Sequence, residues 1–207
     1  GTPLMDSKGR VTSVYVGIFS RITNLMLKGI KPVFIFDGKA PLLKVKEQEE
    51  REYRKQKAEE KLEKAKQEGD ESSILRYSKQ SIRIKKEMMD ESKELIQYLG
   101  LPVIQAPSEA EAQAAFIGER GDVDFVGSSD YDSLLYSAPK IVRNLTLSTR
   151  KRLPSGIYVS VNPELIELKE VLSNLDITQD QLIVLAILVG TDYNDGVKKV
   201  GQKTALK

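Results

Sequence analysis

The stretch Val33-Phe34-Ile35-Phe36 is continuously apolar and ends at Asp37, a pattern typical of a buried β-strand that stops at a polar edge. Two further strand-like stretches also end in acidic residues: 101–106 precedes Glu109 and Glu111, and 123–129 precedes Asp130 and Asp132. In a parallel sheet with helical crossovers, the carboxyl ends of the strands open onto one edge, where α/β proteins place their sites. The sequence therefore predicts five carboxylates in one crevice.

Carboxylates gathered so closely repel one another, so some must be protonated or a cation must lie among them. A divalent metal is the simpler explanation. The 207 residues include no histidine and no cysteine, which excludes Ser-His and Cys-His nucleophile pairs, zinc sites with thiolate or imidazole ligands, and disulfides. Oxygen ligands remain, and they suit Mg²⁺ or Mn²⁺.

The charge of the chain is nearly balanced but unevenly distributed. The formal net charge is only +2, from 32 basic and 30 acidic residues, yet Lys and Arg concentrate in the middle and at the end of the chain. Such segregation is compatible with nucleic-acid binding. The longest apolar runs are too short to span a membrane and the first residues show no signal pattern, so we expect a soluble chain with no membrane partner.

Helical patterns flank the expected strands. Apolar positions at helical spacing predict a helix within 11–27, ended by Gly29, and another from about Ile74 to Tyr98, ended by Gly100. Residues 44–67 are almost entirely charged or amide side chains, which predicts a helix without an apolar face for a core. The fold class is therefore α/β, with a mostly parallel central sheet flanked by helices and an inserted helical hairpin.

The last third of the chain is expected to contain two strand-forming regions and a helix. Residues 140–152 predict a basic β-hairpin region, and residues 157–161 predict a strand. Thr178 is a candidate N-cap for an apolar helix through Leu188, after which Asp192 follows close to Gly190.

Each acidic residue also has a purely structural interpretation. Asp37 is followed by Gly38, a common turn pair, and Asp192 could equally be a turn residue at a helix end. Ser108 is placed as the N-cap of a capping box that includes Glu111. Asp130 and Asp132 are two residues apart, and one of them could cap the following helix. In extended backbone both would leave the same face, as two ligands of one ion must, and capping would not obviously use both.

The basic residues have two interpretations as well. Lys44, Arg51 and Lys55 fall at helical spacings and form a positive ridge, although a solvated helix of this composition shows such ridges by chance. In the glycine-spaced tail, Gly201 and Lys203 could bind a DNA phosphate, and an ordinary helical hairpin is the competing interpretation.

Four motifs in order give the sequence a specific resemblance. They are Phe36-Asp37-Gly38-Lys39-Ala40-Pro41, Ala106-Pro107-Ser108-Glu109-Ala110-Glu111-Ala112, Ser129-Asp130-Tyr131-Asp132, and Gly190-Thr191-Asp192-Tyr193 leading into Gly201-Gln202-Lys203-Thr204-Ala205. With these motifs the chain resembles, nearly end to end, the flap endonucleases of the structure-specific 5′ nuclease family, most of all the archaeal ones. The resemblance implies a PIN-like core formed by residues 1–43 and 94–190, a helical arch over 44–93, and the start of a helix-two-turn-helix motif over 191–207.

The resemblance also implies a role for each candidate residue. A site for two Mg²⁺ ions, which Mn²⁺ can replace, would be formed by Asp37, Glu109, Glu111, Asp130, Asp132 and Asp192. Lys44 and Arg51 would contact the scissile phosphate from the base of the arch. Thr12 and Ser13 would hold a short 3′ flap, while Lys55, Gly201 and Lys203 would contact DNA, with a potassium ion at the helix-two-turn-helix.

The implied activity is cleavage of branched DNA at a 5′ flap, with 5′–3′ exonuclease activity, in replication and repair. Alternatives are an exonuclease or junction resolvase of the same family, a non-catalytic DNA-binding scaffold, and an aspartate-based phosphotransferase. The family's first metal-binding aspartate lies on an N-terminal strand that precedes the equivalent of Gly1, and its sliding-clamp peptide lies beyond Lys207, so we expect a fragment. Its expected location is the cytoplasm or nucleoid for an archaeal protein, and the nucleus for a eukaryotic one.

Overall fold

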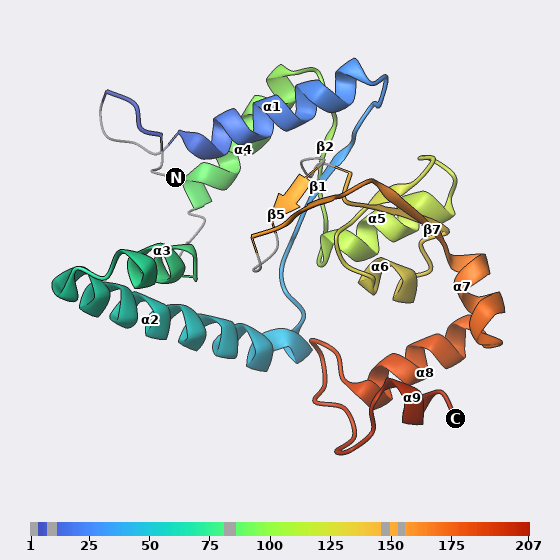
Figure 1. Ribbon diagram of the computed structural model, residues 1–207. Helices are drawn as coiled ribbons and strands as arrows, with labels where there is room; N and C mark the ends of the chain where they lie inside the picture. Colours follow the sequence, from blue (N-terminus) through green and yellow to red (C-terminus); the bar gives the residue numbers. More distant parts are fainter. Residues whose placement is uncertain (1–3, 8–11, 81–85, 146–149, 153–155) are drawn as a thin grey trace.

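A computed structural model of the chain describes residues 4–7, 12–80, 86–145, 150–152 and 156–207, in which short strands alternate with helices (Figure 1). The helices are α1 (Ser13–Leu27), α2 (Val45–Glu68), α3 (Glu71–Gln80), α4 (Lys86–Tyr98), α5 (Ala110–Glu119), α6 (Asp132–Leu135), α7 (Leu168–Leu175), α8 (Gln179–Val189) and α9 (Gln202–Ala205), with a 3-10 turn η1 (Leu42–Lys44) before α2. The strands are β1 (Phe34–Phe36), β2 (Val103–Gln105), β3 (Val126–Gly127), β4 (Lys140–Arg143), β5 (Arg150–Arg152), β6 (Tyr158–Ser160) and β7 (Glu164–Glu167).

Two parallel strand pairs precede the acidic segments. β1 pairs with β2, with Phe34 opposite Val103, and β3 pairs with β4, with Val126 opposite Ile141. The predicted α/β class and the parallel pairing are confirmed. The sheet is less continuous than expected, because in the described part of the chain no strand pairing joins β1–β2 to the β3–β4–β7 sheet, where β7 runs antiparallel to β4.

The main core lies between the β3–β4–β7 sheet and the helices packed against it. Its most buried members are Ala115, Val126, Leu134, Ala138 and Ile141, each at most 5% exposed. Side chains from β7, α7 and α8 complete the cluster. Burial of such apolar side chains is the main stabilising contribution to the platform from which the acidic side chains project.

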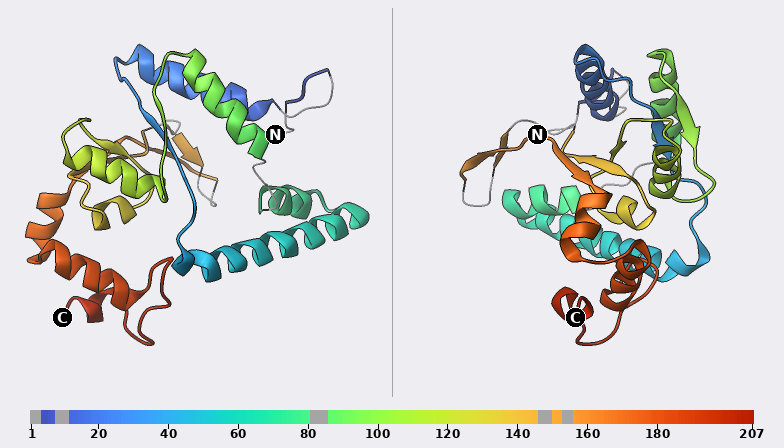
Figure 2. Two further views of the ribbon diagram at one scale, coloured as in Figure 1. Left: turned by 180° about the vertical axis from the view of Figure 1, so that it is seen from behind. Right: turned by 90° about the vertical axis from the view of Figure 1, so that its right-hand side faces the viewer.

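A second packed layer is formed by α1 and α4, which lie side by side in both views (Figures 1 and 2). Ile22 and Leu25 of α1 are buried, as is Ile96 of α4. These are positions of the apolar stripes that predicted both helices. α4 also contacts β2, which connects this layer to the parallel strands.

The charged segment forms a hairpin of α2 and α3 that projects from the core (Figures 1 and 2). The predicted long polar helix is confirmed. It packs on α3 through two small side chains, Ala58 and Ala65, each 4% exposed. Gly69 ends α2 with a φ of +69°, a conformation that favours glycine.

The helix predicted over residues 74–98 is present as α3 and α4, on either side of residues outside the described part of the chain. α3 begins earlier than expected, at Glu71, because Asp70 caps it. The Asp70 Oδ1 atom accepts hydrogen bonds from the backbone N–H groups of Ser72 and Ser73. Bonds to the Ser73 and Ser72 groups lower the pKa of Asp70 to about 2.

The basic hairpin predicted over residues 140–152 is wrong. β4 pairs with β3 and β7, whereas β5 pairs with β6 in a separate ribbon that extends from the body (Figure 2). The physical reason is burial: Ile141 and Val142 belong to the core, so β4 cannot leave it to pair with β5. β7 and α7 were not predicted, whereas α8 begins after Thr178 with the expected cap.

None of the helices in the described segments is by itself long and apolar enough to cross a membrane. Within the same segments, α7 and α8 taken together have sufficient length and apolar composition, but they are bent by 76° relative to each other.

Candidate active site

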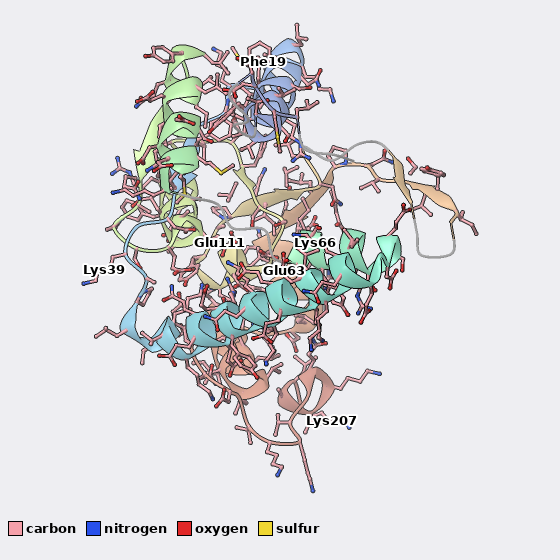
Figure 3. The ribbon with its side chains drawn as sticks, turned by 90° about the vertical axis from the view of Figure 1, so that its left-hand side faces the viewer. Phe19, Lys39, Glu63, Lys66, Glu111 and Lys207 are labelled. Atoms are coloured by element: carbon pink, nitrogen blue, oxygen red, sulfur yellow. The ribbon has the colours of Figure 1, made fainter. Side chains whose placement is uncertain are left out.

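Acidic side chains from four parts of the chain come together beside the base of α2. Asp37 follows β1, Glu109 and Glu111 lie at the start of α5, Asp130 and Asp132 follow β3, and Asp192 follows α8. Figure 3 views the molecule from the side of α2 and α3, with Glu111 labelled near the centre. Of these residues, Glu109, Glu111, Asp130, Asp132 and Asp192 lie within range of one another's charges, whereas Asp37 is connected to them through the start of α5.

Several of these carboxylates lie close enough for their charges to raise the pKa of a neighbour. Burial, followed by the negative charges of Asp132 and Asp130, raises the pKa of Glu111. Burial, together with the charges of Asp192, Asp130 and Glu109, raises the pKa of Asp132. The apo site thus disfavours its own full ionisation, as expected where negative charges exceed the positive charges available.

Asp37 has a structural role at the start of α5. Its Oδ1 atom lies 2.8 Å from the backbone nitrogen of Ala110 and accepts that hydrogen bond, so the end of β1 caps a helix 73 residues away. Ser108, the expected cap, is therefore not the N-cap. Glu109 holds that position in extended conformation, and its side chain makes no capping hydrogen bond.

The expected geometry of Asp130 and Asp132 is also wrong in detail. The two residues do not belong to extended backbone, because Tyr131 has helical dihedral angles (φ −85°, ψ −6°) and Asp132 begins α6. The Ser128 hydroxyl group organises the turn: it accepts from the Asp130 N–H group and lies 3.3 Å from Glu111 Oε1. The segment after β3 is thereby connected to α5.

Lys44 places a positive charge inside the acidic group. Its Nζ atom lies 2.7 Å from Glu109 Oε2 and 3.1 Å from Asp192 Oδ2, and its side chain is only 14% exposed. Burial acts to lower the pKa of Lys44, but the hydrogen bonds to Glu109 and Asp192 outweigh it and raise the pKa above its ordinary value. Lys44 is therefore a charged counter-ion of the carboxylates.

The base of α2 is tied to the segment after α8 by further ion pairs. Arg51 Nη2 lies 2.9 Å from Asp192 Oδ2, and Lys46 pairs with Asp195. The predicted proximity of Lys44 and Arg51 to the acidic site is thus present. Lys55 lies one helical turn beyond Arg51 and is half-buried.

The remaining predicted DNA-binding residues lie outside this cluster of ion pairs. Thr12 and Ser13 are at the start of α1, where the Thr12 N–H group donates to the Leu4 carbonyl oxygen. Gly201 and Lys203 are exposed at the short helix α9, for which Gly201 is the N-cap.

An aromatic cavity of about 540 Å³ adjoins Glu109. It is lined by Pro41, Pro107, Ser108, Glu109, Ala112, Gln113, Phe116, Tyr136 and Tyr193. The hydroxyl oxygens of Tyr136 and Tyr193 are 2.7 Å apart, and burial and this hydrogen bond raise the pKa of Tyr136. Sequence analysis did not identify these tyrosines, although the position of Tyr193 next to Asp192 was a usable signal.

The donor set fits a hard divalent cation in its chemistry, because every acidic ligand candidate offers only oxygen. Across the described ranges, no three acidic side chains are arranged closely enough to hold a metal ion. Several of these oxygens already have partners: Glu109 and Asp192 pair with Lys44, and one oxygen of Asp37 accepts a hydrogen bond from α5. A cation bound by Glu109 and Asp192 would therefore compete with Lys44.

Comparison with known proteins identifies the family of the chain and supports its fold. The model of the XPG N-terminal domain matches residues 2–58, and that of the XPG I-region matches residues 100–192. Flap endonuclease 1 of Ignicoccus hospitalis is 51% identical over 208 residues, which cover 100% of this chain and 59% of that protein. The chain belongs to the flap endonuclease family.

Solved structures of flap endonuclease relatives agree with this assignment. Flap endonuclease-1 from Methanococcus jannaschii matches with a TM-score of 0.71 at 42% identity, over 99% of this chain and 62% of that one. The catalytic core of Rad2 in complex with DNA substrate matches with a TM-score of 0.68 at 28% identity, over 94% of this chain and 51% of that one. The recognised resemblance to an archaeal-type flap endonuclease is confirmed.

The chain spans about 60% of the length of its curated flap endonuclease relatives. For example, it covers 62% of flap endonuclease 1 from Pyrococcus furiosus, at 49% identity. Nucleases of the flap endonuclease family depend on divalent metal ions. The matched regions include all six acidic residues as well as Lys44 and Arg51.

Proposed function

We propose that this chain carries the catalytic part of a 5′ flap endonuclease that hydrolyses DNA phosphodiesters at junctions between single and double strands, in replication and repair. One observation carries the proposal: Lys44, at the base of a projecting helix, lies within ion-pair distance of two members of a convergent acidic group. Metal-dependent phosphodiester hydrolysis uses this combination of carboxylates that hold metal and cations that neutralise phosphate.

In this proposal the six carboxylates would hold two divalent ions, with Mg²⁺ the favoured metal and Mn²⁺ a substitute: Asp37, Glu109, Glu111, Asp130, Asp132 and Asp192. The chemistry supplied by the bound ions is activation of the attacking water and stabilisation of charge on the leaving oxygen. Asp37 also fixes the start of α5, where Glu109 and Glu111 lie, through its bond to Ala110.

Lys44 and Arg51 are the residues that would bind the scissile phosphate. In the structure both pair with Asp192, so they already lie at the boundary between the acidic group and solvent. An incoming phosphate offers them a competing anionic partner. Exchange of Asp192 for phosphate would free a carboxylate for metal and would place two cations beside the developing charge of the transition state.

Other parts of the chain would bind the DNA around the cleavage point. The arch formed by residues 44–93 would surround a 5′ single strand, with Lys55 as a further contact. Thr12 and Ser13 would hold a 3′ flap, and Gly201 and Lys203 would hold duplex DNA beside a potassium ion.

A sliding clamp partner and an archaeal cytoplasmic or nucleoid location belong to the same proposal, and family resemblance alone supports them.

Single-turnover cleavage of a 5′-flap DNA by the full-length protein tests the proposal. Asp130→Asn is expected to abolish cleavage with Mg²⁺ while leaving DNA binding intact. The matched control is Glu63→Gln, which alters an exposed acid of α2 that pairs with nearby Lys66. Near-normal cleavage by Asp130→Asn would overturn the proposal.

A DNA-binding scaffold is the second candidate, favoured by the pairing of Glu109 and Asp192 with Lys44 in place of a ready metal site in the described part of the chain. A scaffold would bind flap DNA without cutting it at any Mg²⁺ or Mn²⁺ concentration. Comparison of flap, gapped and four-way junction substrates separates a flap endonuclease from an exonuclease or junction resolvase.

A further inference from the structure

Arg143 lies at the carboxyl end of β4, beside the segment that carries Asp130 and Asp132. The parallel register places Gly127 opposite Val142, so the chain after β3 passes directly beside Arg143. On its other side, Arg143 faces Glu164 as its cross-strand partner in the antiparallel pair with β7. The sheet therefore fixes the backbone of Arg143 from both sides.

The side chain of Arg143 reaches back over the turn after β3. Its Nε atom donates to the Ser129 carbonyl oxygen at 3.1 Å, and Nη1 donates to the Tyr131 hydroxyl oxygen. The guanidinium carbon lies 4.2 Å from the centroid of the Tyr131 ring. The Arg143 side chain thus contacts the backbone of Ser129, just before Asp130, and the side chain of Tyr131, which lies between the two aspartates.

An arginine suits these contacts better than a lysine. The guanidinium group is planar, so it can stack on an aromatic ring while its N–H groups donate in different directions within the plane. A lysine ammonium could keep the charge opposite Glu164, whose Oε2 atom lies 3.4 Å from Nη1. It has no flat face for Tyr131.

The turn has few other restraints. Asp130 and Tyr131 are exposed, and the segment between β3 and α6 belongs to no strand or helix. At its beginning, the Asp130 N–H group donates to Ser128 Oγ, the Ser128 N–H group donates to the Val142 carbonyl oxygen, and the Ser128 hydroxyl group donates to Glu111 Oε1. At its end, the Tyr131 carbonyl oxygen accepts from the Leu134 N–H group. Arg143 supplies the contacts in the middle of the segment, next to both carboxylates.

We propose that Arg143 is a positioning residue, which orients the Ser129–Asp132 segment so that the carboxylates of Asp130 and Asp132 face Glu111 before a cation binds. This inference rests on the metal-binding role of Asp130 and Asp132 in the proposed function. In this role Arg143 acts through its contacts with Ser129 and Tyr131 and is not itself a metal ligand. Its effect is to reduce the conformational freedom that cation binding would otherwise have to remove.

Two measurements on the full-length protein test the proposal, one of them without metal. Arg143→Lys and Arg143→Met are expected to accelerate amide hydrogen exchange across residues 129–132 of the apo protein by at least ~10-fold. The same variants are expected to raise the Mn²⁺ concentration at half-saturation, measured by electron paramagnetic resonance, by about 5-fold or more. Arg143→Lys alone carries the test if Arg143→Met does not fold.

Two control variants separate positioning from general stability. Arg120→Lys changes another arginine that stacks on a ring, Phe116, and pairs with an acid, Asp122 at 3.0 Å, but does not contact the turn. Glu164→Gln removes the charge partner of Arg143 and leaves its bonds to the turn. Both controls are expected to keep the wild-type exchange rate over residues 129–132 and the wild-type Mn²⁺ midpoint.

The outcomes distinguish this inference from the proposed function. Absence of Mn²⁺ binding by the wild type would overturn the proposed metal site, and with it the positioning role of Arg143. Normal Mn²⁺ binding by the wild type with unchanged exchange and an unchanged midpoint in Arg143→Lys would overturn the positioning role alone. An effect of Glu164→Gln equal to that of Arg143→Lys would also overturn it, because the cross-strand ion pair would then explain both.

Discussion

Lys44 Nζ lies 2.7 Å from Glu109 Oε2, so the base of the projecting hairpin and the start of α5 are joined by an ion pair between residues 65 positions apart. The same Nζ atom is 3.1 Å from Asp192 Oδ2, which brings the segment after α8 into the contact. Three distant parts of the chain therefore share one positive charge, and substitution of Lys44 affects all of them.

Lys44→Met is expected to reduce single-turnover flap cleavage by about 10²–10³-fold, because it removes a cation that stabilises developing phosphate charge. The substitution also releases Glu109 and Asp192, so Mn²⁺ should bind at least as tightly as to the wild type. Lys57→Met is the matched control, since Lys57 lies on α2, the helix that Lys44 precedes, and its ion pair is with exposed Glu60. A cleavage rate within twofold of the wild type would contradict the role of Lys44.

Glu111→Gln and Asp132→Asn are expected to raise the Tm of the metal-free protein at pH 7. Both native carboxyl groups have a raised pKa in the fold, from burial and neighbouring negative charge, so the folded state binds more protons than the unfolded state. Stability is then lost as pH rises above their ordinary values of 4.5 and 3.8.

The Tm advantage of each variant should consequently disappear as the pH is lowered below those ordinary values, where the native groups are protonated in both states. Differential scanning calorimetry with EDTA between pH 3.5 and pH 7, roughly the span that contains both titrations, measures this effect. A constant Tm difference across that range would contradict the electrostatic explanation.

Asp37→Ala and Asp37→Asn should separate the two roles of this residue. Loss of the cap on Ala110 in Asp37→Ala is expected to cost about 1 kcal/mol, or ~2–4 °C in Tm. Asp37→Asn retains an oxygen acceptor at the cap and should remain near the wild-type Tm. Both variants should lose Mn²⁺ affinity, because both remove the carboxylate charge; retention of full affinity by Asp37→Asn would exclude Asp37 as a ligand.

Ala65→Lys is expected to loosen the α2–α3 hairpin without unfolding the core. Ala65 is 4% exposed against α3, so a long charged side chain must displace that helix. Limited proteolysis should then cut within residues 69–80 faster, while the main Tm changes little. Gln56→Lys, at an exposed position of the same helix, serves as the control and should be cut at the wild-type rate.

The sequence predicted the site well where the local pattern of apolar and acidic residues agrees with the topology of the parallel strands. Apolar runs that end in acids predicted that Asp37, Glu109, Glu111, Asp130 and Asp132 would meet, because parallel strands end at one edge. The local geometry predicted around these residues was less reliable. Local spacing suggested a cap at Ser108, whereas the structure uses Asp37 from another strand, a contact that no pattern within α5 encodes.

Tertiary burial decided the features that the sequence did not predict. The basic residues of 140–152 suggested one hairpin, but Ile141 and Val142 hold β4 in the core. Arg143 was not recognised because its partners, Ser129, Tyr131 and Glu164, are distant in sequence and meet only through strand register.

The ion pairs of Lys44 and Arg51 have a consequence for protein depleted of its cations. These two side chains partly balance the charge of the clustered carboxylates from within the molecule. Prolonged treatment with a chelator should therefore leave the fold intact and remove only the metal-dependent activity. Addition of divalent cations to the chelator-treated protein should then restore that activity at once, without a refolding step.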